Sequence, residues 1–316
     1  MSERVGDEVR EDRHGPFAQI DAPKEAPPNS PALMVLQGDG MRVRLVEDEA
    51  GEDAGTAPKR PEDAESGAGW HECKVGVVAS CIKGHTDSDG EYHEPETLTQ
   101  TNVATMEDID HFGDMLMAEA KRRGMGRARE VVAVSDAGHG LPEMWARLFP
   151  WVVWILDFFH VVRRLADCAS EVTLPGAPFR ELLHKWKTLL YDGETSKLLR
   201  ILRAHAHHHV DRPGRPADLP EGSPGRLLWT HVFYIEKYRE HMDYPAYRAK
   251  GWPIGSGHVE SLAGQVGRRM KAANKRWTKH GAEAMANLIA ERRGQDGRWA
   301  KRWPDPLPRP EALQPT

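Results

Sequence analysis

Two short apolar runs, each followed directly by an aspartate, place the strongest constraint on how this chain folds. Residues 130–135 (EVVAVS) precede Asp136, and residues 151–156 (WVVWIL) precede Asp157. Runs of this length, rich in β-branched residues and without polar alternation, are typical of strands covered on both faces. Such strands need helices on either side of their sheet, so the chain is expected to form an α/β fold.

The pattern around these two runs predicts a mixed sheet, with antiparallel strands first and parallel strands afterwards. Three antiparallel strands in hairpins are expected, the first two joined by a Gly-Asp-Gly turn, over residues 32–36, 41–46 and 70–82. Helical spacing of apolar residues alternates with the two runs over 102–124, 141–149 and 159–171. Helices without further strands are expected over 179–209, 227–243, 259–273 and 281–293.

Charge is divided unevenly along the chain. The formal net charge is −5, yet residues 1–66 carry 16 acidic and 8 basic side chains, whereas residues 248–302 carry 13 basic and 4 acidic ones. A basic end of this kind fits a local surface for nucleic acid, although the charge distribution taken alone favours a solvated helix face. The absence of a long apolar run excludes a membrane span, and the polar start of the chain lacks the pattern of a signal peptide. The three cysteines have no metal-binding spacing, so a cytoplasmic location is expected.

Three carboxylates stand where backbone geometry would present them to a ligand. Asp39 and Asp136 follow predicted strands, and Glu260 begins a helix for which Ser256 is the expected N-cap. Acidic side chains that converge at one sheet edge can hold two divalent ions for phosphoryl transfer. Each also has a simpler interpretation: Asp39 as a turn former, Asp136 as a helix cap, and Glu260 as a complement to the helix dipole.

Basic residues follow Glu260 along the same predicted helix and beyond it, where they would meet phosphate groups. They are Arg268, Arg269, Lys271, Lys275 and Arg276. Trp277 comes next and is either a base-stacking residue or part of the core. The small residues Gly264 and Gly267 share a helix stripe with Glu260, which would let DNA or a metal ion approach that face.

Three strings of residues resemble the DDE transposases of bacterial insertion sequences, most of all the ISKra family. They are residues 134–138 (VSDAG), 155–160 (ILDFFH) and 252–260 (WPIGSGHVE). The resemblance covers roughly residues 32–303, and its most specific parts are ILDFFH and PIGSGHVE. It implies an RNase H-like fold with an all-helical insertion before the last catalytic helix.

The resemblance also implies an activity and the residues that carry it. Asp39, Asp136 and Glu260 would bind Mg²⁺ or Mn²⁺, as two ions, while Asp157 and His160 would form an Asp-x-x-His signature. The expected reaction is cleavage and strand transfer of DNA at the terminal inverted repeats and the target. The expected form is a homo-oligomer in a synaptic complex, associated with the bacterial nucleoid and with no membrane partner.

The resemblance divides the chain into five segments. A disordered or degenerate N-terminal segment (1–31) precedes the first part of the catalytic core (32–174), a helical insertion (175–251), the basic C-terminal helices (252–303) and a tail (304–316). The family usually carries a longer N-terminal region with a DNA-binding domain, which is expected to be missing here. An inactive remnant that binds DNA or inhibits a full-length transposase is therefore one alternative, and another RNase H-like nuclease is a second.

Overall fold

Five strands form the central sheet of the computed structural model, which describes residues 32–46, 69–138, 140–271 and 275–304. Their order across the sheet is β5-β2-β1-β6-β7. Their bounds are β1 (Leu33–Arg44), β2 (Trp70–Ile82), β5 (Glu96–Thr105), β6 (Glu130–Ser135) and β7 (Val153–Leu156). The strands β5, β2 and β1 pair antiparallel, while β6 and β7 continue the sheet parallel to β1. The chain therefore has the predicted α/β fold, a mixed RNase H-like sheet.

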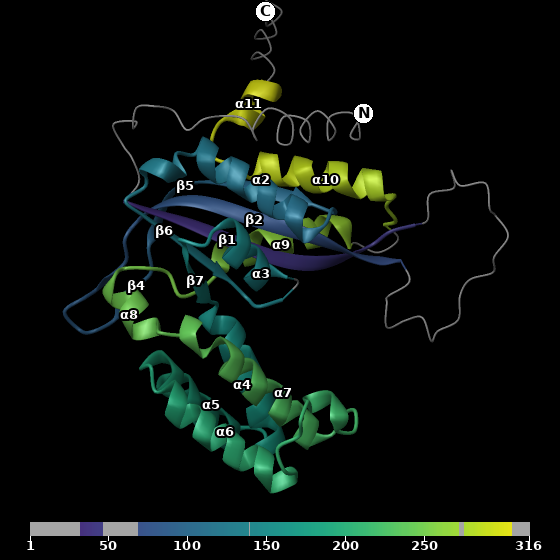
Figure 1. The fold of residues 1–316 in the computed structure, drawn as a ribbon. Helices are drawn as coiled ribbons and strands as arrows, with labels where there is room; N and C mark the ends of the chain where they lie inside the picture. The colour runs from purple at the N-terminus through teal and green to yellow at the C-terminus, as the bar shows by residue number, and fades with distance from the viewer. Residues whose placement is uncertain (1–31, 47–68, 139, 272–274, 305–316) are drawn as a thin grey trace, which may run out of the picture.

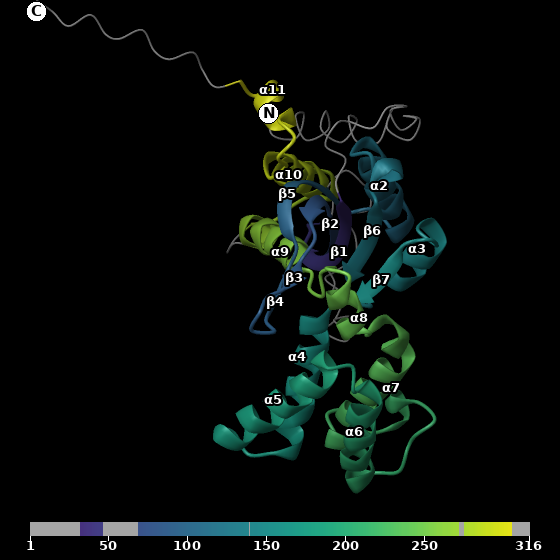
Figure 2. The same cartoon turned by 90° about the vertical axis from the view of Figure 1, so that its left-hand side faces the viewer.

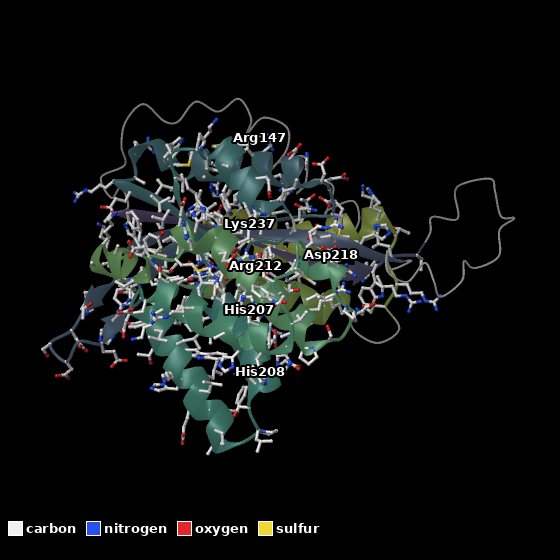
Figure 3. All side chains as sticks on the ribbon, turned by 60° about the horizontal axis from the view of Figure 1, so that its bottom comes forward. Arg147, His207, His208, Arg212, Asp218 and Lys237 are labelled. Carbon is white, nitrogen blue, oxygen red and sulfur yellow. The ribbon has the colours of Figure 1, made fainter. Side chains whose placement is uncertain are left out.

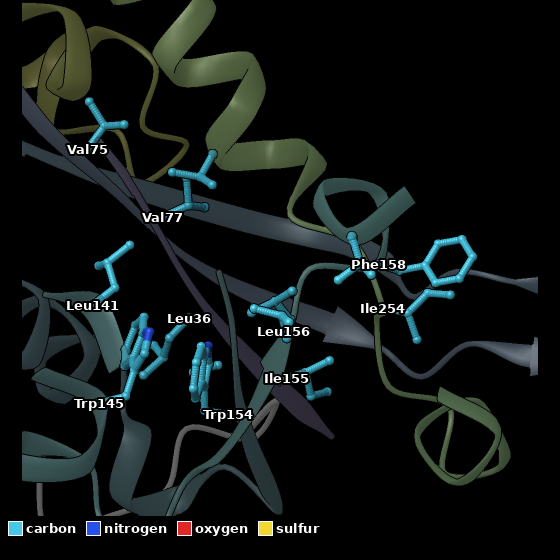
Figure 4. Packing of buried hydrophobic residues seen from close by; sticks show 14 of the residues in the cluster. Leu36, Val75, Val77, Leu141, Trp145, Trp154, Ile155, Leu156, Phe158 and Ile254 are labelled. Carbon is cyan, nitrogen blue, oxygen red and sulfur yellow. The ribbon is translucent and has the colours of Figure 1, made fainter. Parts of the chain in front are cut away.

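Helices cover both faces of this sheet, as Figure 2 shows. One face packs against α2 (Ile109–Arg122) and α3 (Leu141–Leu148), and the other against α9 (Gly257–Met270) and α10 (Lys279–Arg292). On the first face, Leu36, Trp145 and Trp154 lie together in the buried core (Figure 4). This two-sided burial explains why the central residues of β6 and all four residues of β7 are apolar.

A second group of helices extends away from the sheet (Figure 1). Helix α4 (Phe158–Val172) leads from the end of β7 into α5 (Ala177–Tyr191), α6 (Thr195–His209) and α7 (Pro224–Tyr238), and α8 (Tyr244–Ala249) leads back. Trp186 and Trp229 are fully buried among these helices. On their surface, Arg212 and Arg203 both bind the carboxylate of Glu236, with Arg212 near His207 at one end of the group (Figure 3).

Shorter elements complete the described part of the chain. They are the hairpin β3 (His85–Thr86) and β4 (Tyr92–His93), the 3-10 turns η3 (Met125–Arg127), η4 (Pro216–Asp218) and η5 (Arg239–His241), and helix α11 (Arg298–Arg302). None of the helices in the described ranges is long and apolar enough to span a bilayer. The expected disorder of residues 1–31, most of the connection expected between the second and third strands (residues 47–69) and the tail beyond 304 lie outside the described residues. The boundaries of the five predicted segments stay predictions.

The predicted Gly-Asp-Gly turn is wrong, because Gly38, Asp39 and Gly40 lie inside the single long strand β1. A Cβ atom on Gly38 would lie 3.0 Å from Leu141 Cδ2 and 3.4 Å from the ring of Phe112. Glycine at this position therefore gives α2 and α3 room to pack closely on the sheet and does not reverse the chain.

Two further predicted boundaries also differ from the structure. Residues 102–105 belong to β5 and not to the following helix, which begins after Asp108, whose Oδ1 accepts a hydrogen bond from the His111 N–H at 2.8 Å. The predicted helix over 179–209 is two helices, α5 and α6. They are separated at Gly193, whose φ of +78° is in the left-handed region that favours glycine.

Candidate active site

The register between β1 and β6 brings Asp39 and Asp136 to the same edge of the sheet. Gly38 pairs with Ser135 in the parallel ladder; Asp39 is the next residue of β1, and Asp136 is the first residue after β6. Ser135 Oγ accepts hydrogen bonds from Trp145 and Trp154 on the α3 side, at 2.9 and 3.0 Å. Because successive side chains of a strand alternate between faces, Asp39 and Asp136 point to the opposite side, where α9 lies.

Gln37 joins this edge of the sheet to the start of α9. Its Oε1 accepts a hydrogen bond from the Val259 N–H at 3.0 Å, and its Nε2 donates to the Gly255 carbonyl at 3.3 Å. Gln37 is two residues before Asp39 on the same face of β1, so the contact fixes the first turn of α9 over the two aspartates. Glu260 lies in that turn, and its N–H donates to the Ser256 carbonyl at 3.1 Å.

Asp157 follows β7 and is fully buried, with both carboxylate oxygens in hydrogen bonds. Its Oδ1 accepts from the His160 N–H at 2.9 Å, which caps α4, and its Oδ2 accepts from the Ser256 N–H at 2.7 Å and from the Ser256 hydroxyl. Burial disfavours the ionised form, but the hydrogen bonds from His160 and Ser256 outweigh it and hold the pKa of Asp157 below its ordinary value. The predicted N-cap Ser256 thus stands at the start of α9 but binds Asp157 and not a helix N–H.

His160 lies between Asp157 and Glu260. Its Nδ1 is 3.6 Å from Asp157 Oδ1 and 3.5 Å from Glu260 Oε1, and Arg163 Nη2 is 3.6 Å from the same Glu260 oxygen. The neighbouring Asp157 carboxylate raises the pKa of His160, which outweighs the opposing effect of burial. The charge of Asp136 acts in the same direction as that of Asp157.

Electrostatic coupling links the three predicted metal ligands. Burial and then the charge of Asp136 raise the pKa of Asp39 to about 6, with a smaller contribution from Glu260. The Gly40 N–H, which donates to Asp39 Oδ1 at 2.7 Å, and His160 oppose this rise. A carboxylate held near other carboxylates at a raised pKa is expected where a cation compensates their repulsion.

One cluster of side chains could hold a divalent ion. The ligand atoms of Asp157, His160 and Glu260 lie within 4.8 Å of one another, which is the grouping of metal-ligating side chains found among the described residues. Two of its atoms, His160 Nδ1 and Glu260 Oε1, are buried without a hydrogen-bond partner in the described part of the chain. Of the predicted ligand set, this grouping contains Glu260, while Asp39 and Asp136 lie next to it at the sheet edge.

The predicted DNA-contacting residues lie beyond Glu260, at the far end of α9 and after it. Arg268 and Arg269 are exposed in the last turn, and Lys271 follows as its C-cap. Lys275 and Arg276 are exposed as well. Trp277 is half-buried: its indole N–H donates to the Met270 carbonyl at 3.0 Å, and its own carbonyl accepts from the Val46 N–H at 2.8 Å. These contacts explain Trp277 as a structural residue that holds the end of β1.

Sequence reasoning missed several residues at this edge of the sheet. Gln37 and Arg163 carried a recognisable signal, because a glutamine interrupts an apolar strand and an arginine follows His160 at helical spacing. Tyr234 had no such signal, since it belongs to α7, far along the chain. Its ring stacks under Arg164 at 3.8 Å, and burial together with the charge of Asp136 raises its pKa.

Comparisons with known proteins find a distant likeness among solved structures. No protein-family model matches the chain, and no curated protein matches it. Among solved structures, it is similar to the Drosophila P element transposase strand transfer complex, with 13% identity over 87% of this chain and 83% of that chain. The TM-score of the superposition is 0.34. The RNase H-like fold therefore rests on the strand order and pairing of this chain itself.

Proposed function

We propose that the protein is a DDE-type transposase of the insertion-sequence kind, which cleaves DNA at the ends of its element and joins it to a target. The observation that carries the proposal is the convergence of Asp39, Asp136 and Glu260. Asp39 and Asp136 directly follow Gly38 and Ser135, the last pair of the parallel ladder between β1 and β6. Gln37 holds the first turn of α9, which contains Glu260, over the same edge. RNase H-like strand order with acids at this edge suits metal-dependent phosphoryl transfer.

The proposed roles follow from which carboxylate oxygens are free. Asp39, Asp136 and Glu260 would hold Mg²⁺ or Mn²⁺, which when bound activates the attacking oxygen and stabilises the leaving one. Both oxygens of Asp157 already accept hydrogen bonds, so Asp157 is a positioning residue that joins α4 to the turn before α9. His160, whose Nδ1 lies between Asp157 and Glu260, would orient the Glu260 carboxylate.

The proposed substrate is DNA, held first by the exposed cations that follow the site. Arg268, Arg269 and Lys271 on α9, with Lys275 and Arg276 after it, would contact phosphates on either side of the reacting one. The reaction would begin with attack of water on one strand, and the 3′-hydroxyl that is released would then attack the target. Pairing of two DNA ends for this purpose requires a homo-oligomer.

Cleavage and joining of labelled DNA from the ends of the element, with Mg²⁺ or Mn²⁺, tests the proposal. Asp136→Asn keeps the side-chain shape but removes the charge, so joining should fall by roughly 10³-fold, equivalent to about 4 kcal/mol. Asp114→Asn is the matched control, because Asp114 is exposed on α2 on the other face of the sheet. Binding without joining by the unaltered chain would favour an inactive remnant. Metal-dependent cutting without joining would favour a different RNase H-like nuclease.

A further inference from the structure

A groove of about 530 Å³ between α9, α10 and α11 is lined by four arginines. They are Arg268 and Arg269 from the last turn of α9, and Arg292 and Arg293 from the end of α10. None of the four guanidinium groups forms an ion pair with another described residue. Neighbouring arginines behave differently, since Arg298 and Arg302 bind Glu119 and Glu291 at 2.9 and 3.0 Å.

The floor and one wall of this groove are apolar and aromatic. Met285, Leu288 and Ile289 of α10 are half-buried in its floor, and Trp299 of α11 forms a wall. The Arg292 guanidinium lies 5.8 Å from the Trp299 ring centre, and Trp303 lies 5.9 Å from Trp299 with its ring tilted by 37°. Cations at helix C-termini complement the helix dipole, but that effect accounts for neither the apolar floor nor the aromatic wall.

Cations and aromatic faces in one groove match the chemistry of an unpaired nucleic-acid strand. Such a strand offers phosphates for the arginines and open base faces for stacking on tryptophan or an apolar surface. A duplex hides its base faces within the stack, and an acidic peptide segment supplies charge without a planar group at each position. The combination therefore favours a single strand over both other polyanions.

The groove also lies on the path that leads away from the proposed site. Arg268 is eight residues after Glu260 on α9, which corresponds to about 12 Å along the helix. Between them, Gly264 has no side chain, so the helix surface is open there. Arg268 Nη1 lies 3.6 Å from the position that a Cβ atom on Gly264 would take. At a rise of roughly 3.4 Å for each nucleotide, the groove is within about four nucleotides of the reacting phosphate.

We infer that the groove between α9, α10 and α11 binds an unpaired DNA strand next to the reacting phosphate. Arg268, Arg269, Arg292 and Arg293 contact its phosphates, and Trp299 stacks on one of its bases. The inference rests on the proposed function for the identity of the substrate. The binding itself requires neither a metal ion nor the three carboxylates.

Fluorescence polarisation in EDTA, with labelled oligothymidylate of about 20 nucleotides and a duplex of the same length, tests this inference. Arg292→Glu/Arg293→Glu should weaken binding of the single strand by at least about tenfold. Because two phosphate contacts are lost, the salt slope should fall by about 1.4. The control is Arg180→Glu/Arg200→Glu, which makes the same charge change on exposed positions of α5 and α6 and should leave affinity nearly unchanged.

Two substitutions of Trp299 test the proposed stacking on a base. Trp299→Ala should weaken binding of the single strand about tenfold with the salt slope unchanged, and Trp299→Phe should restore most of the loss, because it keeps a stacking face. Thermal unfolding of each variant identifies any that fail to fold. Restored binding in Trp299→Phe separates stacking from a structural role of the indole.

Several outcomes would overturn the inference. They are equal losses in the groove variants and the control, an unchanged affinity in Trp299→Ala, or tighter binding of the duplex than of the single strand. Stronger competition by polyglutamate than by oligothymidylate would instead identify an acidic protein segment as the partner. Because binding is measured in EDTA and joining requires a metal ion, failure of the groove and failure of the catalytic proposal are distinguishable.

Discussion

The hydroxyl group of Ser135 forms three hydrogen bonds next to the candidate site. It is buried one position before Asp136, and its hydroxyl oxygen accepts the indole N–H groups of Trp145 and Trp154 at 2.9 and 3.0 Å. It also donates to the Asp136 carbonyl at 2.7 Å. One hydroxyl thus holds α3 and β7 against β6 at the point where the chain presents Asp136.

Ser135→Ala should therefore destabilise the fold more than the loss of one hydroxyl suggests. It leaves two buried indole N–H groups without their acceptor, and each unsatisfied donor costs roughly 1–3 kcal/mol. We expect the free energy of unfolding in urea to fall by about 3 kcal/mol. Ser170→Ala is the control, because that hydroxyl is exposed and bonds only within α4. A loss below about 1 kcal/mol would show that the indoles find other acceptors.

Asp39 should make stability depend on pH in a direction opposite to that of most carboxylates. Its pKa rises from 3.8 to about 6 on folding, so the folded chain holds its proton more tightly. The stability that this proton contributes is present below about pH 4 and is lost as pH rises through 6, by about 3 kcal/mol. Asp39→Asn cannot ionise and should escape this loss.

The measurement compares the two chains by chemical denaturation in EDTA at several pH values. The difference in free energy of unfolding, variant minus unaltered chain, should grow between about pH 4 and pH 7. Using the difference removes the other titrating groups, which both chains share. A difference that stays constant across this interval would contradict the raised pKa of Asp39.

At the scale of elements, the contact between Asp157 and Ser256 decides how α4 and α9 sit together. Asp157 ends β7 and caps α4, while Ser256 stands at the start of α9, 99 residues later. Ser256→Ala keeps the backbone N–H bond to Asp157 but removes the hydroxyl donor. Hydrogen bonds to charged groups contribute about 1.5–3 kcal/mol, so stability should fall by about 2 kcal/mol.

Positioning and stability can be separated in the same variant. If Ser256 positions Glu260 through Asp157, Ser256→Ala should raise the Mn²⁺ concentration needed for half-maximal cleavage, and Ser256→Thr should restore it because the hydroxyl returns. Ser223→Ala, which removes the N-cap of α7, is the control for a general loss of helix stability. Equal metal dependence in all variants would leave Ser256 with a structural role only.

Elements with a local signal were predictable from the sequence, and those set by long-range packing were not. The run EVVAVS gave the bounds of β6 correctly, because burial on both faces leaves an unbroken apolar pattern. The long strand β1 was misread, because Gly38 and Gly40 suggest a turn unless one knows that Leu141 packs against the first. Strand β5 was missed since its polar residues, such as Asn102, find partners on α10, 188 residues away.

The candidate site divides in the same way. Asp136 follows a recognisable strand, and Glu260 lies in the first turn of a recognisable helix. The likeness of ILDFFH and PIGSGHVE to known motifs singles out Asp157 and His160. Both carboxylate oxygens of Asp157 accept hydrogen bonds, one from His160 and one from Ser256. The contact with Ser256 forms only in the folded chain, so the sequence alone could not indicate it. Tyr234 reaches the neighbourhood of Asp136 from the helical group, which no local pattern could indicate.

At the scale of the whole molecule, the helical group is held to the sheet at the end of β7. Tyr244 is fully buried, and its hydroxyl donates to the Leu156 carbonyl at 3.0 Å, while His241 Nδ1 lies 3.1 Å from the Trp154 carbonyl. These contacts occupy β7 carbonyls next to Asp157. Strand β7 therefore connects the candidate site to the helical group.

Metal binding should therefore stabilise the molecule as a whole, and this linkage provides a test that needs no DNA substrate. A ligand that binds only the folded chain adds about 2.7 kcal/mol at a concentration 100-fold above its dissociation constant. Mg²⁺ or Mn²⁺ should relieve the repulsion between Asp39 and Asp136, so the unfolding temperature should rise with metal concentration and should fall again with EDTA. Asp136→Asn and Glu260→Gln should lose this rise, whereas Asp114→Asn on the far face of the sheet should keep it. A rise of equal size in all four chains would mean that the ions bind elsewhere on the surface and not at Asp39, Asp136 and Glu260.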